Sequence, residues 1–160
     1  MDPSRRRFFS AGYSVPGKRP PWALGEDTFT SLCNRCDACV RACPQRVLSR
    51  GAGGFPTVDF SRAGCTLCGA CVEACERGAL ARAGEPFPWR ARITQRCVSL
   101  RGVECRICAE NCEAGAIRIR LRPGEGARPE LDPELCNGCG QCIAPCPVAA
   151  IDTHATEVAA

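Results

Sequence analysis

Short apolar stretches, separated by turns rich in glycine and proline, set the pattern of this chain. Between Val47 and Phe60, two apolar stretches flank the glycine-rich segment 51–54, which predicts a β-hairpin. Residues 117–121 alternate strictly between aliphatic and arginine side chains, as a half-buried strand does. A turn at 123–126 then directs the chain back toward 130–132. The pattern therefore predicts two hairpins and no long helix.

One apolar pair recurs four times, always four or five residues after a cysteine. The pairs are Val47-Leu48, Ala79-Leu80, Ala116-Ile117 and Ala150-Ile151. This spacing places each pair at the end of a single helical turn. Internal repetition of this kind predicts a fold built from equivalent units.

Cysteine is the residue type that changes this picture most, because sixteen of the 160 residues are cysteines. They form four motifs, of which three read Cys-x2-Cys-x2-Cys-x3-Cys and the third reads Cys-x7-Cys-x2-Cys-x3-Cys. The motifs are Cys33, Cys36, Cys39, Cys43; Cys65, Cys68, Cys71, Cys75; Cys97, Cys105, Cys108, Cys112; and Cys136, Cys139, Cys142, Cys146. This run is typical of bacterial ferredoxins, whose thiolates hold [4Fe–4S] clusters.

The fourth cysteine of such a run ligates the neighbouring cluster in two-cluster ferredoxins. We therefore expect four sets of ligands, each completed by a cysteine from the partner motif. The expected sets are Cys33, Cys36, Cys39 with Cys75; Cys65, Cys68, Cys71 with Cys43; Cys97, Cys105, Cys108 with Cys146; and Cys136, Cys139, Cys142 with Cys112. Four [4Fe–4S] clusters are expected, or three if the stretched third motif is defective and Cys97 is a free buried thiol.

Two other uses of cysteine fit less well. Structural zinc sites use two separated Cys pairs, and these motifs are denser than that. A disulfide framework needs an oxidising compartment. Clusters are therefore the preferred interpretation.

Composition makes the fold depend on these clusters. Aromatic residues are scarce, at 6% of the chain, so a module of this size cannot build an adequate core alone. Bound clusters are expected to supply much of the folding free energy. The formal charge is +4. Four oxidised sites at roughly −2 each would bring the loaded protein to about −4, so the arginines do not indicate nucleic-acid binding.

The expected architecture is a small α+β fold of two ferredoxin-like dicluster modules in tandem. We assign residues 1–28 to an Arg/Pro-rich arm, 29–83 to the first module, 84–153 to the second and 154–160 to a tail. A Pro-Trp step precedes each module, at Trp22 and Trp89. Each Trp is either an ordinary loop anchor or a shield that keeps water from a cluster. His154, in the tail, is expected to be solvated rather than a ligand.

The amino-terminal arm carries Arg5, Arg6 and Arg7 next to Phe8 and Phe9. This opening looks like a twin-arginine export motif, but the polar residues 11–21 follow where an apolar stretch is needed. We therefore expect a cytoplasmic protein, with no membrane span. The arm is either a flexible basic tail or a docking segment for a partner.

No sequence feature points to an enzyme. The chain has no Gly-rich phosphate loop, no Ser/His/Asp set and no flavin or nicotinamide fingerprint. Every cysteine is assigned to a cluster, so no thiol remains as a nucleophile.

Several segments together resemble the family of ferredoxin-type NapF proteins. They are Arg5-Arg6-Arg7-Phe8, Arg19-Pro20-Pro21-Trp22-Ala23, Leu32-Cys33-x-Arg35-Cys36, Gly53-Gly54-Phe55-Pro56-x-Val58-Asp59-Phe60 and the four cysteine motifs. The resemblance implies a cytoplasmic iron–sulfur protein that contacts the catalytic subunit of the periplasmic nitrate reductase and helps to mature it before export. An electron-transfer role in nitrate respiration is the alternative. The chain departs from the ferredoxin run at Glu76 and Glu113, where proline would follow the fourth cysteine. We expect at most a modest lowering of reduction potential there.

Overall fold

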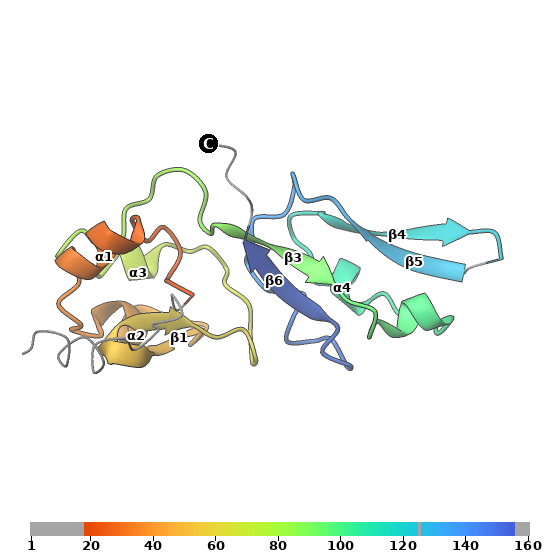
Figure 1. The fold of residues 1–160 in the computed structure, drawn as a ribbon, viewed down its shortest axis with the longest axis horizontal. Coiled ribbons are helices and arrows are strands. Elements are labelled where there is room, and N and C mark those ends of the chain that lie inside the picture. The colour runs from red at the N-terminus through yellow and green to blue at the C-terminus, as the bar shows by residue number, and fades with distance from the viewer. Residues whose placement is uncertain (1–17, 125, 156–160) are drawn as a thin grey trace, which may run out of the picture.

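The structure is a computed structural model, and it describes residues 18–124 and 126–155. Two small groups of elements lie side by side along the long axis (Figure 1). The N-terminal half (residues 18–83) has three short α-helices, one 3-10 helix and one hairpin. The C-terminal half (residues 84–155) has one short α-helix, one 3-10 helix and two strand pairs. The small α+β fold expected from the sequence is confirmed.

The N-terminal half contains α1 (Glu26–Leu32), α2 (Ala38–Ala42), β1 (Leu48–Arg50), the 3-10 helix η2 (Ala52–Gly54), β2 (Pro56–Val58) and α3 (Ala70–Glu73). The C-terminal half contains β3 (Trp89–Ile93), the 3-10 helix η3 (Val98–Arg101), α4 (Ile107–Glu110), β4 (Ile117–Arg122), β5 (Gly126–Leu131) and β6 (Ile151–Ala155). Helices α2, α3 and α4 are short, and each contains the third cysteine of its motif.

Both predicted hairpins are present. β1 pairs antiparallel with β2, with Leu48 opposite Val58. β4 pairs antiparallel with β5, with Ile117 opposite Leu131. The glycine-rich stretch and the turn after residue 122 therefore have the role that the pattern predicted.

A third strand pair was not predicted from the sequence. β3 and β6 are antiparallel, with Ile93 opposite Ile151 and Trp89 opposite Ala155. Their residues are about as far apart in the chain as one module is long, so no local pattern links them. β6 also extends through His154 and Ala155, so the second module continues past its expected end at residue 153. The corresponding contact in the N-terminal half is a single antiparallel bridge between Ala23 and Leu80.

The recurring apolar pairs form the centre of each half. All eight side chains are buried, from Ala150 at 0% exposure to Ile151 at 6%. The second residue of each pair enters a strand or bridge, at Leu48, Leu80, Ile117 and Ile151. The repeat detected in the sequence is therefore a repeat of core positions.

A turn of one shape leads into each pair. The residue three positions after each fourth cysteine has a positive φ and donates its N–H to that cysteine's carbonyl. These residues are Arg46, Gly78, Gly115 and Ala149, with N···O distances of 2.9–3.2 Å. Left-handed backbone is unfavourable for residues other than glycine. The turn is therefore kept at Arg46 and Ala149 at a cost to stability.

Arg19 anchors the start of the described chain. Its guanidinium lies 5.0 Å from the centre of the Phe29 ring and 5.1 Å from that of Phe55. It also pairs with Glu26 in the first turn of α1, and this hydrogen bond lowers the pKa of the Glu26 carboxyl. The contacts hold α1 against the first hairpin.

Ala149→Gly should stabilise the protein. Ala149 is exposed and has φ of 46°, so glycine would relieve backbone strain of about 1 kcal/mol and lose little burial. The denaturation midpoint of anaerobically prepared protein, followed by circular dichroism, should rise. Ala52→Gly is the matched control, because Ala52 is exposed with a negative φ, and there the midpoint should fall. A fall of equal size in both variants would contradict the prediction.

Candidate iron–sulfur centres

Three of the four cysteine loops share one backbone shape. In each, the residue before the second cysteine and the residue after it have positive φ. The pairs are Arg35 and Asp37, Leu67 and Gly69, and Gly138 and Gly140. Two left-handed residues at fixed places curl each loop in the same way, so its three cysteines can face one centre.

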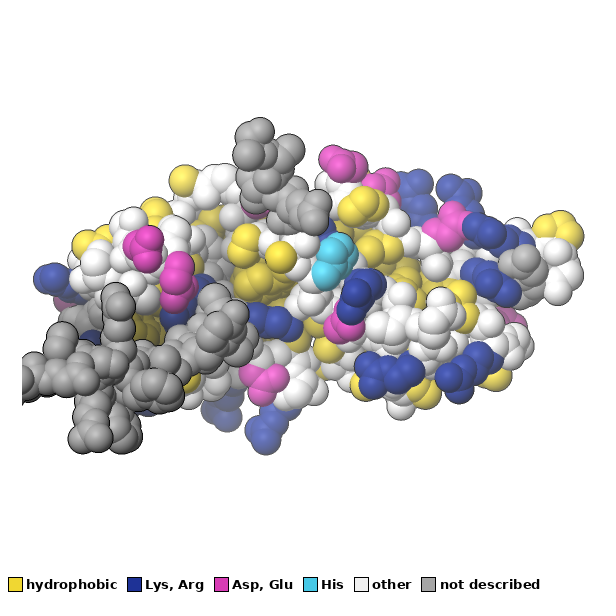
Figure 2. All heavy atoms as spheres, viewed as in Figure 1, with side chains coloured by type: hydrophobic (Ala, Val, Ile, Leu, Met, Phe, Trp, Pro, Cys, Tyr) yellow, Lys and Arg dark blue, Asp and Glu magenta, His cyan; other side chains and the backbone are white. Residues whose placement is uncertain are grey.

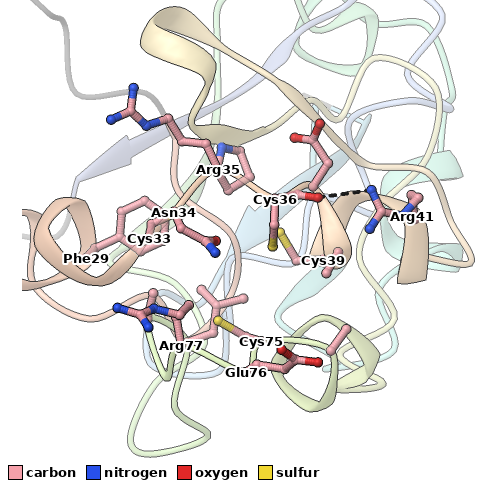
Figure 3. Close-up of a pocket in the computed structure, with 16 residues that line it drawn as sticks. Phe29, Cys33, Asn34, Arg35, Cys36, Cys39, Arg41, Cys75, Glu76 and Arg77 are labelled. Atoms are coloured by element: carbon pink, nitrogen blue, oxygen red, sulfur yellow. Dashed lines mark hydrogen bonds between the residues drawn. The ribbon is translucent and has the colours of Figure 1, made fainter.

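The first loop lies around a cavity of about 210 Å³. Cys33, Cys36 and Cys39 line it together with Cys75, which comes from the second motif (Figure 3). Arg35 and Glu76 also line this cavity. Four sulfurs from two distant segments therefore meet at one place.

Two smaller cavities repeat this arrangement. One is lined by Cys65, Cys68, Cys71 and the exchanged Cys43. The other is lined by Cys97, Cys105, Cys108 and the exchanged Cys146. In both cases three cysteines come from one motif and the fourth comes from its partner.

The pKa values of its cysteines identify the members of the fourth set. Burial raises the pKa of the Cys142 thiol to about 12, and its neighbours Cys139, Cys136 and Cys112 raise it further. Cys139 likewise has a raised pKa, mainly through burial, with Cys112 and Cys136 among the contributing charges. Cys112 therefore lies with the motif of Cys136, Cys139 and Cys142.

The electrostatics of all four sets favour a positively charged occupant. Burial, followed by neighbouring thiols, raises the pKa of Cys71 to about 12 and that of Cys39 to about 11. Burial is also the main cause for Cys65 and Cys108, each at about 11. Four crowded, buried thiolates repel one another unless a cation lies between them. An iron–sulfur core supplies that charge, and it uses only sulfur donors, so the residues fit the cofactor.

A site for a single ion is a different geometry. Among residues 18–124 and 126–155, no three His, Cys, Asp or Glu side chains converge closely enough to hold one metal ion. The cysteines are also free of disulfide bonds in this part of the chain, which contains all sixteen. The cysteine side chains instead line cavities, each with cysteines from two motifs.

The stretched third motif folds without removing Cys97 from its set. The extra residues form η3 and end at Gly102, whose φ is +86°. Ser99, 2% exposed, donates its hydroxyl to the carbonyl of Ala127 at 2.7 Å and ties η3 to β5. Cys97 is buried beside Cys105 and Cys108. The insertion is thus taken up by one helical turn.

Three backbone N–H groups donate to cysteine sulfurs. Leu67 donates to Cys65 at 3.3 Å, Ala91 to Cys136 at 3.5 Å and Ala150 to Cys146 at 3.2 Å. Hydrogen bonds to cluster sulfurs help to set reduction potential. Sequence reasoning missed these groups because any residue type can supply a backbone N–H.

The two tryptophans are linked to equivalent cysteine loops, Trp89 directly and Trp22 through an arginine. Trp89 is 7% exposed and donates its indole N–H to the carbonyl of Gly138, in the fourth loop, at 3.1 Å. Trp22 reaches the second loop indirectly. Its ring stacks with Arg82 at 5.0 Å, and Arg82 donates to the carbonyl of Leu67. Both residues hold loops in place, and Arg82 carries no motif signal that would have revealed this role.

Other expected features lie elsewhere. Arg5, Arg6, Arg7, Phe8 and Phe9 are outside the described residues. Glu113 lies near the fourth set, where its charge adds slightly to the raised pKa of Cys139.

No helix among the described residues is long and apolar enough to cross a membrane. Arginine side chains are prominent on the surface of the C-terminal half (Figure 2).

Comparison with known proteins agrees with this geometry. The 4Fe-4S dicluster domain family matches residues 32–79 and 101–150, which together span more than half of the chain. The chain is therefore an iron–sulfur protein of the ferredoxin class, with two dicluster domains in tandem.

The relatives define the family more narrowly. A ferredoxin-type protein NapF of Escherichia coli K12 is 40% identical over 155 residues, covering 94% of each chain. A ferredoxin-type protein NapF of Haemophilus influenzae is 44% identical, covering 84% of this chain and 77% of its own. The ferredoxin-type protein NapG of E. coli K12 is 32% identical, covering 80% of this chain and 65% of its own. The chain belongs to the family of ferredoxin-type NapF proteins.

The exchanged cysteines can be tested by reciprocal variants. Cys75→Ala should cost about four iron atoms per chain and leave Cys33, Cys36 and Cys39 open to alkylation, because Cys75 lies in their cavity. Cys43→Ala should expose Cys65, Cys68 and Cys71 instead. Mass spectrometry after anaerobic alkylation gives the result. Labelling of each variant's own loop, with the partner loop protected, would contradict the exchange.

Proposed function

We propose that the protein binds four [4Fe–4S] clusters through its sixteen cysteines. The ligand sets are Cys33, Cys36, Cys39, Cys75; Cys65, Cys68, Cys71, Cys43; Cys97, Cys105, Cys108, Cys146; and Cys136, Cys139, Cys142, Cys112. The observation that carries this proposal is the convergence of four sulfurs from two motifs at each place.

The cofactor and the protein would have separate roles in this function. A bound cluster supplies reversible one-electron chemistry. The chain's own residues hold the iron, exclude water with the buried apolar pairs and donate N–H groups to sulfur. No catalytic group is assigned, and the protein is proposed to be an accessory protein or a carrier rather than an enzyme.

The biological role proposed first is maturation of the periplasmic nitrate reductase catalytic subunit in the cytoplasm, before its export. Membership of the NapF family supports it, together with the resemblance of the Arg-rich arm and the Arg19–Ala23 segment to that family. In this role the clusters serve the immature partner, and residues 5–9 are proposed to dock on it. Arginines would pair with carboxylates, and the two phenylalanines would fill an apolar groove.

An electron carrier in nitrate respiration is the second candidate. One contact favours it, because the backbone N–H of Cys65 donates to the carbonyl of Cys139 at 2.8 Å. Two cysteine sets from different halves are thereby adjacent, as a path for electrons requires. Ligand spacing alone serves both roles equally.

Cluster content is the direct test of the ligand proposal. After anaerobic reconstitution, iron and acid-labile sulfide should each approach about 16 per chain, since each cluster contains four of each. Cys97→Ala should lower both values to about 12, because it removes a ligand from the third site only. A plateau near 12 in the unaltered protein would show that the stretched motif does not complete its site.

Replacing Arg5, Arg6 and Arg7 by alanine tests the role of the arm. The complex with the immature catalytic subunit should weaken, while iron content stays unchanged because no cluster ligand is altered. Affinity is measured by titration of the two purified proteins, and the iron–sulfur content of the exported subunit is measured in cells. Replacing Arg118, Arg120 and Arg122 on β4 removes the same charge elsewhere and should leave the affinity unchanged.

The outcome in cells separates the two roles. Incomplete assembly of the exported subunit supports maturation. If fully assembled subunit accumulates and only its reduction slows, the maturation proposal is wrong and the carrier role replaces it.

A further inference from the structure

A hydrogen bond joins the two halves of the molecule at their cysteine loops. The N–H of Cys65 donates to the carbonyl oxygen of Cys139 at 2.8 Å. Cys65 belongs to the second cysteine set and Cys139 to the fourth. The two thiols are also close enough for the charge of Cys139 to contribute to the raised pKa of Cys65, after burial and nearer neighbours. The second and fourth sets are therefore neighbours across the interface.

Two glycines allow this approach. Gly64 directly precedes Cys65, and a Cβ atom there would lie 2.4 Å from the Cα of Gln141. Gly140 directly follows Cys139, and a Cβ atom there would lie 2.4 Å from the Phe60 ring. Real side chains do not reach such distances, so any larger residue would push the two loops apart.

Aromatic packing keeps the loops together. Phe60, from the N-terminal half, meets Phe87 edge to face with ring centres 5.9 Å apart. Phe87 stacks on Trp89 at 4.7 Å, and Trp89 donates to the carbonyl of Gly138. All three rings are buried, at 1–7% exposure. Arg90, 7% exposed, adds hydrogen bonds to the carbonyls of Phe87 and Pro133. The fourth loop is thus fixed against the N-terminal half.

The four sets consequently form a single row whose order differs from chain order. The first and second sets are adjacent, since Cys71 has Cys39 among its electrostatic neighbours and the two sets exchange Cys75 and Cys43. The third and fourth sets exchange Cys146 and Cys112. The Cys65–Cys139 contact joins the second set to the fourth. The row runs first, second, fourth, third.

We propose that the Cys65–Cys139 contact is an electronic connection that makes the four sites one continuous path. The proposal rests on the four-cluster function above. From sulfur to sulfur, the path follows the side chain and N–H of Cys65, one hydrogen bond, and the carbonyl and side chain of Cys139. With clusters bound at both sites, an electron that crossed would leave one cluster oxidised by one electron and the other reduced by one electron. No covalent bond is made or broken and no proton is transferred.

Gly64→Ala tests the connection while leaving every ligand in place. Fully reduced protein, prepared with excess dithionite, is measured by low-temperature EPR, in which nearby paramagnetic sites broaden one another's signals. The variant should keep the iron and sulfide content of the parent. Because magnetic interaction between sites falls with their separation, the broadening that comes from the second and fourth sites should weaken, and the signals should saturate at lower microwave power. Gly25→Ala is the control, because Gly25 is exposed and nothing lies within 4 Å of the added Cβ atom.

Two measurements on the unaltered protein keep the proposal testable if the variant fails to fold. The Cys65 amide hydrogen should exchange slowly with solvent, because it is bonded across the interface. The EPR spectrum should show more interaction than two separate dicluster pairs give. A rapidly exchanging Cys65 amide, or a spectrum that is the sum of two independent pairs, overturns the proposal.

Cluster content separates this inference from the proposed function. If the protein has full iron content but the EPR spectrum shows no interaction between the halves, only the proposed connection is wrong. If the iron content stays below that of four clusters, the four-cluster proposal is wrong, and the connection is wrong with it. The proposal is also wrong if the Cys65 amide of Gly64→Ala exchanges rapidly with solvent while the EPR broadening stays the same as in the unaltered protein.

Discussion

Each cysteine site must bring four sulfur atoms together in a partly buried space, although neighbouring thiolates repel one another there. Burial and neighbouring thiols raise the pKa of Cys71 and Cys142 to about 12, so these side chains favour the neutral thiol unless a cation lies beside them. A cationic core reverses this preference, because it stabilises the thiolate form that binds it. Binding of the cofactor therefore goes together with loss of protons from the thiols, and its free energy adds to the free energy of folding. This explains how a fold with so few large apolar residues depends on its clusters.

The fourth cysteine of each motif lies with the first three cysteines of its partner motif, and this exchange joins two loops into one module. One loop supplies three sulfurs, and the fourth comes from a turn in the partner motif, so neither motif can complete a site alone. The apolar pair after each fourth cysteine is buried and anchors that turn to the core, while turn residues such as Arg46, Gly78 and Ala149 stay exposed. Left-handed backbone at Arg46 and Ala149 is accepted for the same reason, since the turn must place the cysteine before the chain enters a strand.

The interface between the two halves also depends on close approach of the backbone and on packing of a few aromatic rings. Gly64 and Gly140 leave room for two cysteine loops to meet, and the rings of Phe60, Phe87 and Trp89 fix the distance. Both proposed roles are compatible with this contact, because an accessory factor and an electron carrier would hold the same clusters.

The sequence by itself determined the cofactor class, the four motifs, the repeat of apolar pairs and both local hairpins. These features are local, because ligand spacing and alternation are fixed within about ten residues of chain. It also predicted the exchanged sets through the ferredoxin pattern. The tertiary structure alone decided the β3–β6 pair, the place of Cys97 after the inserted η3 turn, and the roles of Arg82 and Arg90. It alone brought Cys65 to Cys139. Contacts between residues this far apart depend on how whole modules pack, and no short-range pattern records that.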